Sequence, residues 1–390
     1  MRRPEDELAQ LTESGLLRGL RPIEAMVGPA VTMGGSRYLN FSSNDYLGLA
    51  QHPALKEAAT RALDQWGTGS TASRLICGSL APHHDLEETI MELKGTEAAV
   101  AFATGYATAV GTTTALVGKG DTIILDKLSH ASLVDGARLS GATIRVFPHN
   151  HLGKLERLLS GTREKSAADS RILVVTESVF SMDGDLAALD QIVDLKDRFG
   201  ALLLLDEAHG LGVLGPNGQG LAEALGLGSR IDLQLGTLGK AVGSGGGYVA
   251  TSRPLADLLV NKARALIYST APPPAQAAAA SAGLRLIASP EGTGRREQLW
   301  SHLRRFAGLT GLPDPTSAIV PLIIGSNEPA LAAATGLLDH GFLVPAIRYP
   351  TVPRDTARLR ITFSADHQSS DIDTLAAHIN TLQRTTPTSS

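Results

Sequence analysis

The chain has 390 residues, of which 43% are hydrophobic and 19% charged, and its formal net charge is -4. The length suits one large domain and a smaller one, whereas the weakly acidic charge excludes the basic surface that nucleic acid or an anionic membrane would need. A single cysteine excludes an internal disulfide, and the acidic start of the sequence excludes a signal peptide. No apolar run reaches the roughly 20 residues of a membrane span, so we expect a cytoplasmic protein.

The first 45 residues are expected to form a helix and a hairpin ahead of the large domain. Apolar residues recur at helical spacing from Glu5 to Leu20, and Arg18 falls near the end of this helix, where a cation is favourable. A hairpin follows from Val27 to Phe41, and Asn44 lies in the polar loop after it.

Residues 46–290 predict the large domain, because strands and helices alternate along them. The expected strands are Ala98–Phe102, Thr122–Leu125, Thr143–Phe147, Ile172–Thr176, Ala201–Leu205, Leu233–Leu235 and Tyr248–Ala250. The expected helices are Pro53–Trp66, His84–Lys94, Tyr106–Val117, Ala131–Leu139, Leu152–Leu159, Leu189–Phe199 and an alanine-rich helix that ends near Ile287. This alternation predicts an α/β fold with a mainly parallel sheet covered by helices on both faces.

Residues 291–390 predict a small α+β domain at the C-terminal end. Its expected helices are Glu297–Phe306, Pro329–Asp339 and Asp371–Leu382. Its expected strands are Ala318–Ile324, Phe342–Ile347 and Leu359–Phe363.

Lys240 is the only charged side chain between Asp232 and Arg253, in a stretch of glycines, small residues and aliphatic residues. Burial of a lysine favours its neutral, nucleophilic amine, which a Schiff base with a carbonyl group requires. The alternative is a lysine that extends from a glycine loop into water, and this segment alone does not decide between the two. A phosphate-binding loop is excluded, because Lys240 is followed by Ala241 rather than by Ser or Thr.

Polar residues follow several of the expected strands, at the sheet edge where open α/β proteins bind their ligands. Gly105 and Tyr106 open a helix directly after a strand, where backbone amides and the helix dipole favour a phosphate. Asp206 closes an apolar strand and needs a positive partner, for which a protonated pyridine nitrogen would serve. A phosphate site, a Schiff-base lysine and such an acid together describe pyridoxal 5'-phosphate (PLP). Each residue alone also has a purely structural explanation, so the hypothesis rests on their succession along the chain.

A competing glycine pattern runs from Gly210 to Gly215 and matches the fingerprint of dinucleotide-binding proteins. The residues after it include Pro216, Gly218 and Gly220, which prevent the helix that the fingerprint should open. We therefore predict a loop at residues 210–215. Separately, we expect no metal site in this chain.

Several motifs resemble those of the α-oxoamine synthases, a family of fold type I PLP enzymes. They are Asn40–Gly48, Leu128–Ser132, Val179–Asp185, Asp206–Gly210, Thr351–Pro353 and Arg358–Arg360. The resemblance extends from about Arg18 to His367, nearly the whole chain. It implies a fold type I PLP-dependent transferase with a large and a small domain.

The resemblance implies a role for each residue that would hold the cofactor. Lys240 would bind PLP and would also remove the α-proton of the amino acid, and Asp206 would pair with the pyridinium nitrogen. His130 would stack on the ring, and His209 would hydrogen-bond the ring oxygen. The residues expected near the phosphate or elsewhere beside the cofactor are Gly105, Tyr106, Ser181 and Thr237.

The resemblance also implies substrate contacts and a homodimer in which two subunits share each active site. Arg348 would bind the substrate carboxylate, and Arg18 and Thr351 would help to bind substrate, which replaces the helix-end explanation for Arg18. The other residues expected to contact substrate or to act across the dimer interface are His130, Asn44, Ser269 and Thr270.

The implied reaction condenses L-alanine with a pimeloyl thioester of coenzyme A or of an acyl carrier protein. It gives 8-amino-7-oxononanoate, CO2 and the free thiol carrier, in biotin biosynthesis. Two departures from the family pattern bear on the choice of acyl chain: Thr71–Ser73 stands where relatives often have glycines, and Tyr349 where proline is common. Two alternatives stay open, namely a glycine-using relative such as 2-amino-3-ketobutyrate CoA ligase or 5-aminolevulinate synthase, and a non-catalytic partner subunit, against which Lys240 argues.

Overall fold

Seven strands form the central sheet of the larger part of the molecule, in the order β4-β10-β9-β8-β7-β5-β6. This computed structural model describes residues 3–165, 167 and 169–385. The strands are β4 (Ala98–Phe102), β5 (Thr122–Asp126), β6 (Thr143–Phe147), β7 (Ile172–Glu177), β8 (Leu202–Asp206), β9 (Leu233–Thr237) and β10 (Gly247–Thr251). All neighbours are parallel except β10, which runs antiparallel to both β4 and β9. The predicted, mainly parallel sheet is therefore confirmed.

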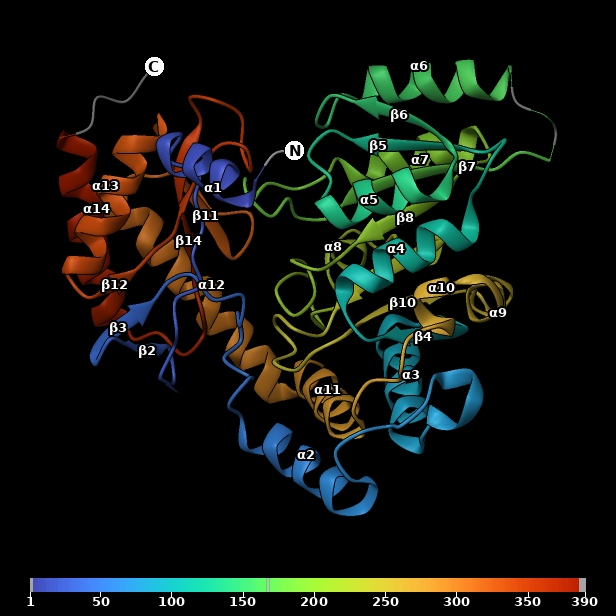
Figure 1. Ribbon diagram of the computed structural model, residues 1–390, viewed down its shortest axis with the longest axis horizontal. Coiled ribbons are helices and arrows are strands. Elements are labelled where there is room, and N and C mark those ends of the chain that lie inside the picture. Colours follow the sequence, from blue (N-terminus) through green and yellow to red (C-terminus); the bar gives the residue numbers. More distant parts are fainter. Residues whose placement is uncertain (1–2, 166, 168, 386–390) are drawn as a thin grey trace.

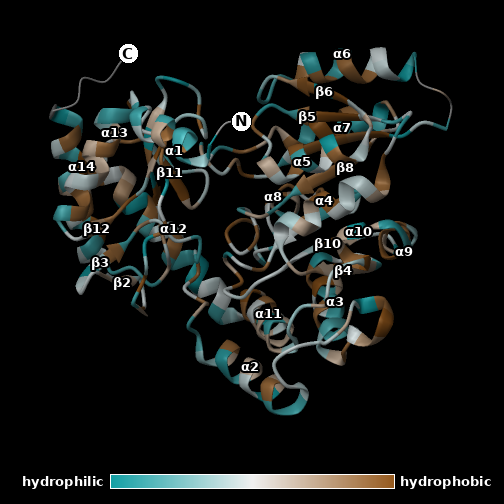
Figure 2. Cartoon of the chain, in the orientation of Figure 1, coloured by the Kyte–Doolittle hydropathy of each residue, from teal (hydrophilic) through white to brown (hydrophobic). Residues whose placement is uncertain are grey.

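Helices cover both faces of this sheet, because its strands are apolar on both sides. Ala99 and Ala101 of β4 pack into one core cluster, and Val100 and Phe102 into the other. The helices are α2 (Pro53–Trp66), α3 (Ala81–Lys94), α4 (Gly105–Leu116), α5 (Ala131–Ser140), α6 (Leu152–Arg163), α7 (Leu189–Arg198), α8 (Leu221–Ala224), α9 (Arg253–Lys262), α10 (Arg264–Ile267) and α11 (Pro274–Ile287). Figure 2 shows the strands of the sheet as mostly hydrophobic.

The smaller part of the molecule combines the C-terminal residues with the N-terminal hairpin (Figure 1). Its helices are α12 (Pro290–Thr310), α13 (Asn327–Asp339) and α14 (Ser369–Thr385). One sheet contains β11 (Ile319–Gly325), β14 (Ala357–Thr362) and β13 (Ala346–Ile347), and the other contains β1 (Ala25–Val27), β2 (Ala30–Met33), β3 (Ser36–Asn40) and β12 (Phe342–Leu343). Because Leu39 pairs with Phe342 in parallel strands, the two ends of the chain share a sheet. The division into residues 1–45, 46–290 and 291–390 stays a proposal.

Three expected elements differ from the structure. The first helix, α1, covers only Pro4–Glu13, because Gly15 adopts a φ of 64°, a left-handed conformation that ends a helix. Arg18 therefore lies beyond the helix rather than at its end. The expected strand Phe342–Ile347 is two strands in different sheets, separated at Pro345, which has no N–H to donate. The helix expected at Glu297–Phe306 is the longer α12, whose N-terminus is capped by Ser289.

The glycine pattern from Gly210 to Gly215 forms a loop of turns, as predicted. Among the residues that the structure describes, no helix has both the length and the apolar character needed to cross a membrane.

Candidate active site

A cavity of about 210 Å³ lies at the carboxyl ends of β7, β8 and β9 and beside the first residues of α4 and α5. Its wall includes predicted site residues from four separate stretches of the chain: Gly105, Tyr106, His130, Asp206, His209, Thr237 and Lys240. The remaining wall residues are Ser132, Glu177, Ala208 and Leu235. The sheet edge thus brings together the side chains that sequence reasoning collected strand by strand.

Lys240 lies just after β9, and its Nζ is 2.7 Å from Nε2 of His209. Burial lowers the pKa of Lys240 to about 8, although the carboxyl groups of Asp206 and Glu177 act in the opposite direction. An amine with this pKa is partly neutral near pH 7, so it can attack a carbonyl group or accept a proton.

Two buried carboxyl groups, those of Asp206 and Glu177, share the cavity wall with Lys240. Asp206 ends β8, and its Oδ1 accepts a hydrogen bond from the backbone N–H of Ala208 at 2.9 Å. Glu177 ends β7, and its Oε1 accepts from the backbone N–H of His130 at 2.5 Å. Burial raises the pKa of both carboxyl groups, and Asp206 raises that of Glu177 further. A cationic ring nitrogen next to Asp206 would lower the cost of keeping a carboxylate there.

A chain of hydrogen bonds connects His209 to the smaller part of the molecule. The hydroxyl of Tyr46 lies 2.6 Å from Nδ1 of His209 and 3.1 Å from Oδ1 of Asn44, and the Arg360 guanidinium donates to the same Oδ1 at 3.3 Å. Because arginine only donates, Oδ1 must accept, so the Tyr46 hydroxyl donates to Oδ1 and accepts from Nδ1–H of His209. Burial lowers the pKa of His209 well below its usual value and keeps the ring neutral. Its Nε2 is therefore an acceptor that faces Lys240.

His130 caps the N-terminus of α5 with its side chain. Its Nδ1 accepts from the backbone N–H of Ser132 at 3.2 Å and lies 2.8 Å from the Ser132 hydroxyl. Burial lowers the pKa of His130. A neutral ring fixed in this way on the cavity wall could stack on a planar cofactor.

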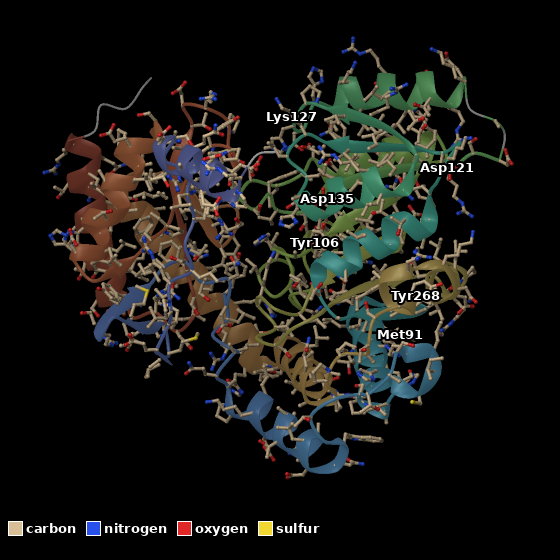
Figure 3. The ribbon with its side chains drawn as sticks, viewed as in Figure 1. Met91, Tyr106, Asp121, Lys127, Asp135 and Tyr268 are labelled. Carbon is tan, nitrogen blue, oxygen red and sulfur yellow. The ribbon has the colours of Figure 1, made fainter. Side chains whose placement is uncertain are left out.

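The N-terminus of α4 completes the wall. Gly105 packs beside Thr237, since a Cβ atom on the glycine would lie in van der Waals contact, 3.4 Å, with Oγ1 of Thr237. The hydroxyl of Tyr106, a half-exposed residue, donates to Asp135 at 3.0 Å, and Figure 3 shows these two side chains on the same face of the molecule. Free amides at a helix N-terminus, an amine of lowered pKa and a buried acid fit the phosphate, aldehyde and pyridine nitrogen of PLP.

Apart from His130, the predicted substrate residues do not line this first cavity in the single chain. Arg18 and Arg348 line a second cavity of about 640 Å³, between residues 17–21, α13 and the segment from β12 to β13. Arg348 donates to the carbonyls of Gly15 and Leu17, which holds the N-terminal segment against this surface. Among the described residues, the walls of the two cavities do not include Thr351, Ser181 or Asn44. The backbone oxygen of Ser181 accepts from Arg360 at 2.6 Å, and Thr351 donates its backbone N–H to Arg348.

Four residues of this region have no role predicted from the sequence: Glu177, Tyr46, Arg360 and Ser132. Glu177 carries the same signal as Asp206, an acid that closes an apolar strand. Arg360 is only 5% exposed and lies in a strand whose residues are all buried. A buried charge of this kind requires a functional or structural partner. Tyr46 had no signal of its own beyond its motif, because its partners come from distant parts of the chain.

The fold and this site define a fold type I PLP-dependent transferase. Residues 36–379 match the family Aminotransferase class I and II, and the chain belongs to this family. It is 48% identical over 377 residues to the 8-amino-7-oxononanoate synthase of Geobacter sulfurreducens, with 95% of each chain covered. It is 47% identical over 379 residues to the 8-amino-7-oxononanoate synthase of Methylococcus capsulatus, with 95% of this chain and 96% of the relative covered.

Two solved structures agree with this assignment. A serine palmitoyltransferase from S. paucimobilis with bound PLP and myriocin has a TM-score of 0.91 at 32% identity, and the match covers 98% of this chain and 96% of that chain. The 8-amino-7-oxononanoate synthase from Francisella tularensis has a TM-score of 0.75 at 26% identity, with 89% of this chain and 98% of that chain covered. The predicted fold class and family are confirmed.

Proposed function

We propose that this chain condenses L-alanine with a pimeloyl thioester to give 8-amino-7-oxononanoate, CO2 and the free thiol carrier, the 8-amino-7-oxononanoate synthase reaction of biotin biosynthesis. The observation that carries the proposal is Lys240, a lysine of lowered pKa on the wall of a cavity that also holds a buried acid and an open helix N-terminus. Identities near 48% over almost the full chain to enzymes of this name support the substrates. A cytoplasmic location is part of the proposal.

Each of the residues around the cavity would have its own role in the proposed reaction. When bound, PLP supplies an aldehyde that reacts with amines and a ring that withdraws electrons from the α-carbon of the amino acid. Lys240 would hold the cofactor and, as a neutral amine, would also take the proton from that α-carbon. Asp206 stabilises a positive charge at the pyridine nitrogen. His130 would cover the ring, and Nε2 of His209, which lies 2.7 Å from Nζ of Lys240, would accept a hydrogen bond from the ring hydroxyl.

The second cavity supports a substrate-binding role for the arginines that line it. Arg18 and Arg348 present guanidinium groups there beside an apolar wall that includes Leu331 and Leu338. Such a wall suits an acyl chain, and guanidinium groups suit a carboxylate. We include Thr351 and Asn44 in the substrate site. The acyl carrier is coenzyme A or an acyl carrier protein, and both belong in the assays.

A homodimer with shared active sites is the assembly that we propose. Ser73 and Thr270 form a β-bridge that places residues 71–73 beside Ser269 and Thr270. Next to this bridge Ile76 is 78% exposed and Tyr268 71% exposed. Large apolar side chains that project together from a surface mark an interaction site, and a second copy of the chain would cover them.

Absorption spectroscopy with PLP tests the cofactor site. The wild-type protein should gain a visible band, and borohydride reduction followed by peptide mapping should place the label on Lys240. Lys240→Ala should bind PLP without a reducible bond. A label on a different lysine would refute the assignment of roles.

An assay matrix tests the reaction itself. Alanine, glycine and serine would each be offered with pimeloyl-CoA, acetyl-CoA and succinyl-CoA, and release of free thiol would be followed. Alanine with pimeloyl-CoA should turn over fastest. Preferred use of glycine would favour 2-amino-3-ketobutyrate CoA ligase or 5-aminolevulinate synthase, and a protein that stays colourless with PLP would favour a non-catalytic subunit.

A further inference from the structure

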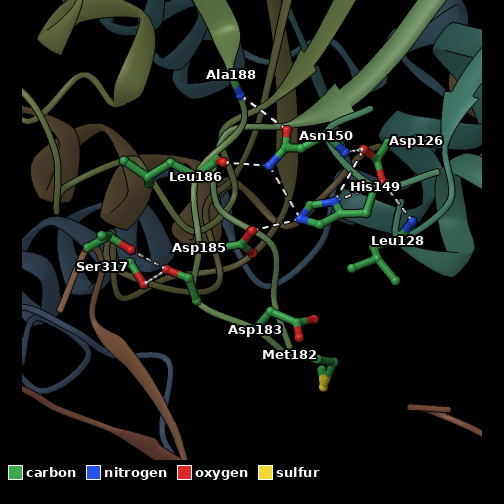
Figure 4. Close-up of polar contacts among 12 residues, drawn as sticks. Asp126, Leu128, His149, Asn150, Met182, Asp183, Asp185, Leu186, Ala188 and Ser317 are labelled. Atoms are coloured by element: carbon green, nitrogen blue, oxygen red, sulfur yellow. Dashed lines mark hydrogen bonds and ion pairs between the residues drawn. The ribbon is translucent and has the colours of Figure 1, made fainter. Parts of the chain in front are cut away.

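His149 lies between two carboxyl groups just outside the candidate active site (Figure 4). Its Nδ1 is 3.1 Å from Oδ1 of Asp126, and its Nε2 is 2.7 Å from Oδ2 of Asp185. The imidazole ring is nearly perpendicular to the Phe180 ring, at an interplanar angle of 82°, with the ring centroids 4.3 Å apart. The ring therefore joins the end of β5 to the segment that follows β7.

The geometry fixes the charge of this ring. A neutral imidazole has one N–H and one lone pair, so one of its nitrogens would point a lone pair at a carboxylate. With acids at both nitrogens, His149 must carry both protons and donate twice. Burial lowers the pKa of His149, but the hydrogen bonds to Asp126 and Asp185 outweigh it and raise the pKa to about 10.

On one side, His149 is connected through Asp126 to the loop of residues 127–129, which precedes His130 on the cavity wall. Asp126 is buried at the end of β5, and its carboxylate also accepts the backbone N–H groups of Leu128 and Asn150, at 2.8 and 3.0 Å. The loop from residue 127 to residue 129 leads directly to His130, whose own N–H is bound by Glu177. The charge on His149 thus offsets a buried carboxylate that shapes this loop.

On the other side, His149 holds a segment that contacts the smaller part of the molecule. Residues 181–185, here called the junction segment, receive hydrogen bonds from four side chains of that part. Ser317 and Thr316 donate to the Gly184 carbonyl, Arg358 binds Asp183, and Arg360 donates to the Ser181 carbonyl. Asp185 is the member of the segment that faces back toward His149.

We propose that His149 is a positioning residue for the proposed reaction: as an imidazolium bound to Asp126 and Asp185, it sets the position of the His130 loop relative to the junction segment. The ring touches neither cavity wall, so it acts through these two loops. Loss of the cation leaves a buried carboxylate without its partner and frees both loops to shift. A misplacement of about 1 Å in such a site lowers a rate on the order of 100-fold.

The test compares His149→Ala with Asp185→Asn, which removes one carboxylate from a half-exposed position and should leave the fold intact. The control is His151→Ala, which removes an exposed histidine two residues away that caps α6 and makes no side-chain hydrogen bond to either loop. Each protein is loaded with PLP, and we would measure the circular dichroism of the bound cofactor, kcat and KM, with and without added imidazole. The dichroism reports the position of the groups around the ring and does not depend on which amino acid is the substrate.

For His149→Ala we expect kcat to fall on the order of 100-fold, with a smaller change in KM. PLP should still bind, but its dichroism should be altered. Added imidazole should restore both kcat and the dichroism. Asp185→Asn should share the altered dichroism, and His151→Ala should match wild type. Wild-type dichroism in both His149→Ala and Asp185→Asn would overturn the proposal, as would a loss of activity that imidazole does not reverse in a protein that still binds PLP. A wild-type enzyme that binds PLP but does not condense alanine would instead contradict the proposed function, which this inference otherwise rests on.

Discussion

Nζ of Lys240 lies 2.7 Å from Nε2 of His209, and burial lowers the pKa of both groups. Arg360, Asn44 and Tyr46 fix the proton of His209 on Nδ1, so the amine faces an acceptor rather than a second cation. A lysine held in this way keeps its reactive form at a lower pH than a lysine in water.

We expect the rate of PLP capture by the cofactor-free protein to rise with pH up to about 8 and then to level off. The attacking species is the neutral amine, and the pKa of Lys240 is lowered from 10.5 to about 8. Stopped-flow absorbance at a series of pH values measures this rate. A rate that continues to rise toward pH 10.5 would mean that the lysine is solvated.

Tyr46→Phe should destabilise the cofactor-free protein by about 1–3 kcal/mol, because it leaves the buried Nδ1–H of His209 and Oδ1 of Asn44 with one partner fewer. Urea unfolding measures this change. Tyr106→Phe is the control, since it removes a hydroxyl from an exposed pair with Asp135. Equal losses for the two variants would argue against the hydrogen-bond chain as a stabilising feature.

The sequence predicts those parts of the site that depend on local signals. Asp206 and Lys240 are predictable because a charge in an apolar stretch needs a partner or a function, and because the carboxyl ends of parallel strands meet at one edge of the sheet. Glu177 carries the same signal and could have been found with them. The link from Tyr46 to His209 joins residues 163 positions apart, and no local pattern contains it.

Other features depend on contacts that no spacing rule reveals. Gly292 lies inside α12, where a Cβ atom would overlap the carbonyls of Leu286 and Ile287, so this glycine permits close packing and does not break the helix. Arg18 fits a helical pattern, but the helix ends at Glu13 and the segment that follows is held by Arg348 from the other end of the chain. At Arg18 a tertiary contact therefore overrides the local pattern.

His149 should stabilise the fold in a pH-dependent manner. Its folded-state pKa of about 10 lies above the unfolded value of 6.5, so its contribution is complete below pH 6.5 and is lost as pH rises through about 10. The charged groups that face the ring are the carboxyl groups of Asp126 and Asp185. The difference in unfolding free energy between wild type and His149→Gln, from urea titrations, should therefore shrink over this window. A difference that stays constant would show that the ring contributes packing rather than charge.

Gly236→Ala should distort the strand that leads to Lys240. Gly236 pairs directly across the sheet with Tyr248, whose buried ring lies over it, and a Cβ atom would overlap that ring. Because Tyr248 is fully buried, we expect the overlap to cause a loss of about 1–3 kcal/mol in urea unfolding and less borohydride-trapped PLP on Lys240. Gly228→Ala is the matched control, since a Cβ atom there meets no neighbour within 4 Å, and it should change stability by less than about 0.5 kcal/mol. If Gly236→Ala were as stable as Gly228→Ala and trapped as much PLP, the packing of Tyr248 on β9 would not control where the lysine lies.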